Sequence, residues 1–331
     1  MNTSPPLLFL DLLADRPLTP AAVLFRFSDG SLDSLLTLLM APSCLALVEE
    51  FPSFVDSEEA HRLPPDSLQA LLQTGVKLLP VDIVHLSEDL RTSVVPASAQ
   101  WITGNWYLTP PPKPAGSQAT SRALALKLLQ MVTSDSDSRD IEEIFRRAPE
   151  LSYHLLRIVN SVGMGASKKI SSLAQAILIL GRQQLKRWLS LMLFSAGKED
   201  SRSAMLLARA ALRARSMELL ARSAGLDRSW QELSFMAGMF SLLGILFGLP
   251  LSEILKPLQI SDLLVDALLR HENEVGHLLK AVELAESGSA SELQDLLKDL
   301  GLSSSEFNTL VIEAHLWMLR FVCGQQANAH G

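Results

Sequence analysis

The sequence predicts a mainly helical protein in which a bundle of helices follows a shorter unit of mixed strands and helices. Hydrophobic residues make up 48% of the 331 residues and are mostly Leu and Ala, which lose little side-chain freedom in a helix. Four of the five residues at 110–114 are proline, and such a run cannot continue a helix or a central strand. We therefore expect two domains, residues 1–112 and 118–325, joined by this linker.

The first domain is predicted to be a small truncated α/β unit. Its apolar runs at 21–27 and 75–83 have the length of strands, and segments 33–40 and 66–73 have the pattern of short helices. An eight-fold β/α barrel needs roughly 250 residues, so this domain can form only part of one. We expect the unit to be incomplete, to pack on the helical domain and to be poorly stable alone.

The second domain is predicted to be helical throughout. Ser172 and Gln175 have the spacing of a capping box, in which each side chain bonds the other residue's backbone N–H. Gly181 suits the end of the helix that they begin. Residues 203–224 form a long helical pattern, and apolar residues at helical spacing mark a terminal helix over 307–318.

Charge is distributed unevenly along the chain. Residues 1–121 carry 6 basic and 13 acidic side chains, residues 122–228 carry 18 and 10, and residues 229–331 carry 5 and 13. The middle third thus has a net charge of +8 between segments of −7 and −8. Two interpretations stay open: the acidic segments fold against the basic one, or the basic one presents a face to an acidic partner.

The sequence indicates a cytoplasmic location. Two cysteines are too few for a disulfide framework, and the N-terminus lacks the basic region of a signal peptide. Residues 233–252 carry no charge and are long enough to span a bilayer, but they contain three glycines and a proline and have no basic flank. We expect a buried core helix and a turn there, and no membrane partner.

Ordered motifs in the second domain resemble the HDOD (HD-related output domain) family of bacterial signalling proteins. They read RAPEL at 147–151, HLLRIVNS at 154–161, ISSLAQAI at 170–177 and LG at 180–181. Residues 213–221 and 237–243 look like the subgroup in which an EAL domain precedes the HDOD domain. The resemblance covers roughly residues 120–325 and implies an all-helical bundle that relays signals without chemistry.

Three shorter segments of the first domain resemble the EAL family of cyclic-di-GMP phosphodiesterases. LFR at 24–26 is similar to the end of the motif strand, and GVKLLPVD at 75–82 to the strand that normally ends in paired aspartates. GNWYLTP at 104–110 is similar to the closing strand. The resemblance implies that residues 1–112 are a degenerate, truncated EAL domain.

Both resemblances place unsuitable side chains where metal ligands belong. Ala22 stands in place of the motif glutamate, and Val81 replaces one of the paired aspartates, so that Asp82 alone remains. Ser241 and Leu242 occupy the place of the His-Asp pair of HD hydrolases. One carboxylate cannot assemble a two-metal site, so we expect a pseudoenzyme with no catalytic residue, no bound metal and no cofactor.

Other catalytic patterns are also missing. The sequence has neither a Gly-x-Ser-x-Gly motif nor a Walker-type glycine-rich loop. Histidines that could bind a metal are scattered without ligand spacing, and we expect each to be a surface or hydrogen-bonded side chain. They are His154, His271, His277 and His315.

Basic residues of the middle third are the remaining candidates for a binding surface. The candidates for partner contact are Arg182, Lys186, Arg187, Arg213 and Arg215. Lys186 follows Arg182 by four residues, so both can lie on one helical face. A solvated helix surface is the competing interpretation. We do not expect nucleic-acid binding, because no recognition helix is apparent.

The expected function is that of a non-catalytic bacterial signalling protein that acts as a protein-interaction or scaffold output module. Its expected partner is another signalling or regulatory protein. A sensor that binds cyclic di-GMP without hydrolysing it is an alternative that we do not favour. A metal-dependent phosphodiesterase is a further alternative, against which the missing ligands argue. Metal content and titration with cyclic di-GMP discriminate between the three.

Overall fold

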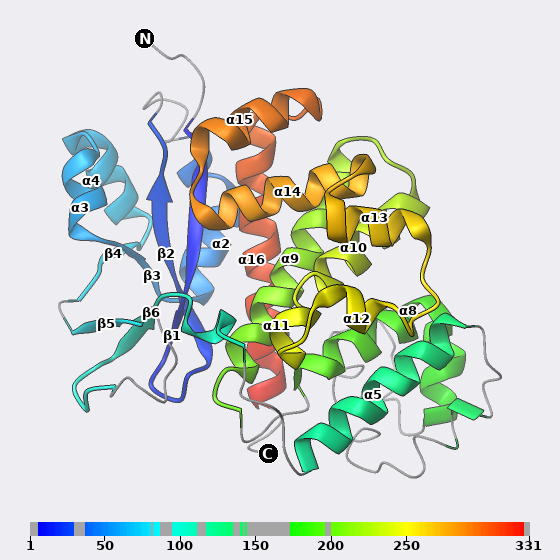
Figure 1. Ribbon diagram of the computed structural model, residues 1–331. Coiled ribbons are helices and arrows are strands. Elements are labelled where there is room, and N and C mark those ends of the chain that lie inside the picture. The colour runs from blue at the N-terminus through cyan, green and yellow to red at the C-terminus, as the bar shows by residue number, and fades with distance from the viewer. Residues whose placement is uncertain are drawn as a thin grey trace.

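The computed structural model of the chain describes residues 6–29, 37–80, 82–86, 95–110, 117–134, 140–141, 143, 173–195 and 200–327. A curled sheet with short flanking helices lies beside a larger body of helices (Figure 1). The expectation of a mainly α protein with a small α/β unit at its N-terminus is confirmed.

Strands and short helices form the first unit. In chain order they are β1 (Leu8–Ala14), β2 (Pro20–Phe27), α2 (Pro42–Glu50), β3 (Ser53–Val55), α3 (Ser57–Arg62), α4 (Pro65–Gln73), β4 (Lys77–Leu78), β5 (Ile83–His85), β6 (Trp101–Thr103) and the 3-10 turn η1 (Trp106–Leu108). The predicted strand at 21–27 and helix at 66–73 are confirmed. The apolar run at 75–83 supplies two short strands rather than one.

Helices form the second unit. They are α5 (Ser117–Thr133), α8 (Leu173–Ser195), α9 (Ser203–Ser223), α10 (Arg228–Phe240), α11 (Leu243–Phe247), α12 (Leu251–Leu255), α13 (Asp262–Arg270), α14 (Asn273–Ser287), α15 (Ala290–Asp299) and α16 (Ser304–Ala327). Gly181 has φ 67° and interrupts α8, as the sequence predicts, while Ser172 lies outside the described residues. The long helix at 203–224 and the terminal helix are confirmed.

The sheet curls until its two edges approach each other. Its strand order is β4-β3-β2-β1-β6-β5, and β1 is antiparallel to both of its neighbours. The outermost strands β4 and β5 follow each other in the chain with only four residues between them. Such a connection spans at most roughly 18 Å, so the edges cannot lie far apart.

Side chains on one face of the sheet show the same curvature. Phe54 of β3 and Trp101 of β6 have ring centroids 5.4 Å apart, although two strands separate them in the sheet order. In a flat sheet, three strand spacings would place them about 14 Å apart. Both rings pack on a small apolar cluster with Leu13, Ala22 and Leu24, so the curled sheet encloses a core of its own.

Helix α9 forms the centre of the second unit and packs against α8, α10, α14 and α16. Most of its residues are buried. Gly238 of α10 lies directly on α9: a Cβ atom at this position would come within 2.5 Å of the Cα atom of Ala214. Only glycine permits so close an approach of the two helices.

The terminal helix α16 joins the two units, as Figure 1 shows. The carboxamide of Asn308, which is 1% exposed, accepts a hydrogen bond from the Leu8 N–H (2.8 Å) and donates one to the Pro6 carbonyl (2.7 Å). These are the bonds that a neighbouring strand would supply to β1. One continuous hydrophobic core therefore includes residues of both units.

The uncharged segment at 233–252 forms α10, α11 and the turn that follows. By length and composition, the stretch Arg228–Phe247 could cross a membrane, with a mean hydropathy of 1.3. Half of that stretch is buried inside the protein, and among the described residues no other helix meets this criterion.

Candidate functional site

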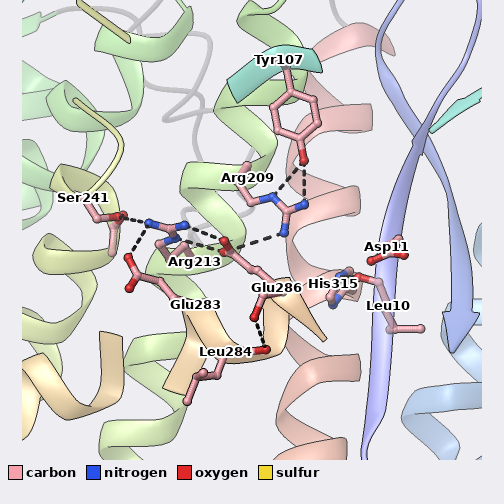
Figure 2. Close-up of polar contacts among 12 residues, drawn as sticks. Leu10, Asp11, Tyr107, Arg209, Arg213, Ser241, Glu283, Leu284, Glu286 and His315 are labelled. Carbon is pink, nitrogen blue, oxygen red and sulfur yellow. Dashed lines mark hydrogen bonds and ion pairs between the residues drawn. The ribbon is translucent and has the colours of Figure 1, made fainter. Parts of the chain in front are cut away.

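A buried network of charged side chains lies where the two units meet (Figure 2). Arg209 and Arg213 lie one turn apart on α9, and Glu283 and Glu286 face them from α14. At the other end of the network, Arg209 donates hydrogen bonds from Nε (3.0 Å) and Nη2 (2.6 Å) to the hydroxyl of Tyr107 in η1. The network thus connects the end of the sheet unit to the centre of the helical unit.

Arg213 has the most complete set of partners in this network. Its Nε and Nη2 donate to the two carboxylate oxygens of Glu286 at 3.0 and 2.5 Å. Its Nη1 donates to the hydroxyl of Ser241 at 2.9 Å and to Glu283 at 3.4 Å. Glu286 also lies 3.8 Å from Nη1 of Arg209. Two buried cations therefore share one carboxylate, with Glu283 as a second.

The electrostatics keep these groups charged. Burial lowers the pKa of Arg213, but the charge of Glu286 and the hydrogen bonds to it raise that pKa by more, so that it ends above its ordinary value. Burial raises the pKa of Glu286, and the charges of Arg213 and Arg209 outweigh this and lower it. Each partner stabilises the ionised form of the other.

The guanidinium of Arg213 lies against Ser241, one of the two residues that the HD resemblance aligns with the metal-binding His-Asp pair. Ser241 and Leu242 stand at the place of the ligand pair; Leu242 is buried, and Ser241 directs its hydroxyl to Arg213 and to the Gly238 carbonyl. A metal ion beside Ser241 would have to displace a buried positive charge. Among the described residues, no group of three or more His, Cys, Asp or Glu side chains could hold a metal ion.

The positions that the EAL resemblance singles out hold no ligand cluster in the described part of the chain. Ala22 is fully buried in the apolar cluster of the sheet. Asp82 is exposed just before β5, and Val81 lies outside the described residues. The interior of the curled sheet around Ala22 is filled with apolar side chains.

His315 of α16 is buried between the two units. Its Nδ1 lies 2.7 Å from the Val311 carbonyl and its Nε2 lies 3.1 Å from the Leu10 carbonyl of β1. Burial lowers the pKa of His315 to about 4, although both carbonyls favour the charged form. A neutral imidazole has one N–H, so it satisfies one of these two carbonyls at a time. His315 is thus a hydrogen-bonded core histidine.

The other histidines have separate surroundings. Nε2 of His271 lies 2.8 Å from Glu283 at the outer end of the network, and His277 is exposed. His154 lies outside the described residues.

Two of the predicted partner-contact residues form internal ion pairs on another face of α9. Arg187 of α8 donates to Glu218 at 2.5 Å and to Glu232 at 2.8 Å, and its guanidinium lies 4.0 Å from the centroid of the Phe235 ring. Arg215 donates to the second oxygen of Glu218 at 2.6 Å. These cations, like Arg213, are directed into the protein.

The remaining two candidates lie on α8. Lys186 is half-buried, and its backbone carbonyl accepts a hydrogen bond from Ser190. The side chain of Arg182 lies outside the described residues. Of the four candidates whose side chains are described, therefore, three are held by carboxylates, two of them by carboxylates of the acidic C-terminal segment. The structure favours the interpretation that the acidic segment folds against the basic one.

Sequence reasoning did not identify Tyr107, Arg209, Glu283 or Glu286. One signal was available: Arg202, Arg209 and Arg213 recur at spacings of seven and four, which places them on one face of the predicted helix. Charges on the buried face of a helix need partners. Arg202 fits this rule as well, because it pairs with Asp200 at 2.8 Å and bonds the carbonyl of Thr109 at the end of η1.

Comparison with known proteins finds a family match within the helical unit. Residues 120–255 match the HDOD domain family, so an HDOD domain is found there. The uncharacterized protein YuxH of Bacillus subtilis is 27% identical over 331 residues, which cover 95% of this chain and 78% of YuxH. The EAL resemblance of the first unit stays a prediction.

Two further similarities cover less of this chain. The cyclic di-GMP phosphodiesterase CdgJ of Vibrio cholerae is 29% identical over 195 residues, which cover 59% of this chain and 45% of CdgJ. The match thus spans less than half of that protein. A solved structure of a candidate phosphohydrolase from Shewanella amazonensis SB2B aligns with a TM-score of 0.40 and 15% identity over 65% of this chain and 94% of that chain.

Proposed function

We propose that the protein is a non-catalytic signalling protein whose HDOD domain acts as a protein-interaction or scaffold module in the cytoplasm. The contact between Arg213 and Ser241 carries this proposal. A fixed guanidinium there supplies the positive charge that a metal would bring, but it has no open coordination position and cannot activate water. In this proposal the side chains of the site stabilise the fold and do not catalyse a reaction.

The first unit supports the same proposal. We propose that residues 1–112 are a truncated EAL domain that has lost its catalytic centre. Ala22 stands where the motif glutamate would lie, and it packs against Leu24 and Phe54. Such an apolar interior cannot stabilise a divalent cation, because burying an unpaired ion costs several kcal/mol or more.

Metal content and turnover test the absence of catalysis. The full chain, purified without chelators, is expected to carry no stoichiometric Mg, Mn, Fe or Zn by elemental analysis. With added Mg²⁺ or Mn²⁺ it is expected to leave cyclic di-GMP and bis(p-nitrophenyl) phosphate unchanged, while an active phosphodiesterase serves as the positive control. Turnover that a chelator abolishes and that follows the protein through purification would contradict the proposal.

The partner surface is proposed to include Arg182 and Lys186, which lie one turn apart on α8. Arg187 should be left intact in any test, because reversing its charge would place a third carboxylate beside Glu218 and Glu232. Unfolding of the domain would then be mistaken for loss of binding.

A charge-reversal pair tests this surface. A partner captured by the wild-type chain in its native cell and identified by mass spectrometry is purified, and association is measured with Arg182→Glu/Lys186→Glu. The matched control is Lys256→Glu/Lys280→Glu, which changes the same charge at exposed positions of α12–α14. Only the first pair is expected to slow association, with a smaller difference at high salt because exposed charges are screened beyond about 8 Å at physiological ionic strength. Equal rates would contradict the proposed surface.

A sensor that binds cyclic di-GMP without cleaving it is the second candidate, and the similarity to CdgJ favours it. The cavity beside the charged network, between β1, α9, α14 and α16, holds about 50 Å³, while ligand pockets usually have several hundred. Calorimetric titration of the full chain with cyclic di-GMP separates the two candidates. Saturable one-to-one binding would favour the sensor over the scaffold.

A further inference from the structure

A larger pocket opens elsewhere between the two units, where strands β2 and β3 end. Its volume is about 400 Å³, within the range of small-molecule sites. Because β2 and β3 are parallel, their carboxyl ends meet at this edge, which is where open α/β sheets commonly bind ligands. Four acidic side chains line it, those of Asp29, Asp56, Glu58 and Glu59.

Both units contribute walls to this pocket. Phe9 and Phe27 are buried at its apolar side, and the guanidinium of Arg26 lies 5.8 Å from the centroid of the Phe9 ring. Gly288, in the turn between α14 and α15, closes the other side: a Cβ atom there would lie 3.3 Å from Nη1 of Arg26. The pocket is therefore a feature of the assembled protein.

The charge of the pocket is negative. Arg26 is neutralised by Asp11, to which it donates two hydrogen bonds of 2.6 and 2.9 Å. Arg62 contacts Asp29 at 2.9 Å and Glu59 at 3.3 Å. With four carboxylates against two guanidinium groups, the lining residues sum to −2, and Asp11 adds a further negative charge behind them.

Glu59 is the deepest of these carboxylates. Its side chain is 7% exposed, and Arg62, its ionic partner, is itself 48% exposed at the rim. Burial raises the pKa of Glu59, and the charge of Arg62 only partly offsets this. A second cation in the pocket would stabilise the part of the Glu59 charge that Arg62 does not neutralise.

We propose that this pocket binds a small organic cation that carries an ammonium or guanidinium group on a short alkyl chain. The charged group would lie beside Glu59 and the exposed Glu58, and the chain would lie against Phe9 and Phe27. Anionic dinucleotides are disfavoured here by the same charges. This inference is independent of the proposed scaffold function, because a non-catalytic module can bind such a cation or lack it.

A matched pair of ligands tests the proposal on the full chain. 1,4-Diaminobutane and 1,4-butanediol have the same chain length and differ in charge, so calorimetric titration is expected to show one-to-one binding of the diamine alone. Glu58→Gln/Glu59→Gln is expected to weaken binding at least about tenfold, which corresponds to about 1.4 kcal/mol. The matched control Glu272→Gln/Glu274→Gln, at exposed positions of the α13–α14 region, is expected to bind as the wild type does.

Two further measurements keep the test decisive. Because Glu59 is buried, Glu58→Gln alone serves as a variant that leaves the core intact, and it is expected to weaken binding by a smaller factor. N-acetyl-lysine methylamide distinguishes a partner's side chain from a free amine as the source of the cation. The proposal is overturned if the diamine shows no binding up to about 10 mM, if the diol binds equally well, or if the pocket variants retain full affinity.

Discussion

The guanidinium of Arg213 donates a hydrogen bond to the hydroxyl of Ser241 at 2.9 Å, which ties α9 to the end of α10. The same guanidinium is held by two hydrogen bonds to Glu286 of α14. Three helices therefore meet on one buried cation. Its removal should affect the stability of the whole helical unit.

Replacing Arg213 by methionine, which keeps much of the volume, is expected to lower the free energy of unfolding by about 3–5 kcal/mol. The loss arises because Glu286 would remain buried with only Arg209 as its cation, at 3.8 Å. Urea denaturation at pH 7 measures the change. Arg270→Met is the control, because Arg270 is 52% exposed and its ion pairs should contribute less than about 1 kcal/mol. Equal losses in both variants would show that the buried pair has no special role.

Replacing Asn308 by alanine is expected to destabilise the junction of the two units by roughly 2–4 kcal/mol. The Leu8 N–H and the Pro6 carbonyl would each lose a buried partner. Hydrogen exchange of the Leu8 amide reports the local effect and denaturation the global one. Thr309→Ala is the neighbouring control, since its hydroxyl bonds the Ser305 carbonyl of its own helix. Unchanged exchange at Leu8 would contradict the role of Asn308.

Acid is expected to destabilise the protein through His315. Its pKa is about 4 in the folded state and about 6.5 when unfolded, so the unfolded chain binds more protons between these values. Stability should therefore be complete above pH 6.5 and fall by roughly 3 kcal/mol as the pH decreases to about 4. His315→Gln, which cannot titrate, should show a flatter profile of unfolding free energy over this window. Parallel profiles for the two proteins would refute the assignment.

Separated fragments are expected to fold poorly. Residues 1–112 should show no cooperative thermal transition, because β1 would lose the side chains of α16 that satisfy its backbone. Residues 118–331 should be destabilised as well, since Arg209 would lose Tyr107 and the core of α16 would lose β1. Circular dichroism of each fragment, and of the two mixed, measures this. A sharp transition in the isolated 1–112 fragment would show that the curled sheet is self-sufficient.

Some features could be predicted from sequence because they depend on local patterns. Apolar spacing identified α9 and α16, and Gly181 marked a break in α8. The resemblance to the HDOD family could also be recognised from the sequence, because its motifs are unbroken runs of residues. Strand β1 was not predicted: Asp11 interrupts its apolar run, and only the ion pair with Arg26 on the next strand makes that charge acceptable within a sheet.

The curvature of the sheet could not be read from sequence either. The run at 75–83 has the length of one strand, but its two ends pair with different strands, β3 and β6. That arrangement depends on residues far apart in the chain, such as Phe54 and Trp101, that meet only when the edges close.

The sequence alone determined the helical class of the protein and the resemblance of its middle part to the HDOD family, because residue type and spacing are local properties. Only the tertiary structure decided where the positive charges of the middle segment are directed. Arg213 and Glu286 are separated by 73 residues, and the sequence around each residue does not indicate that the two form a pair. A buried charge is stable only beside its partner, so the fold, by bringing the two together, turned an expected surface cation into an internal one.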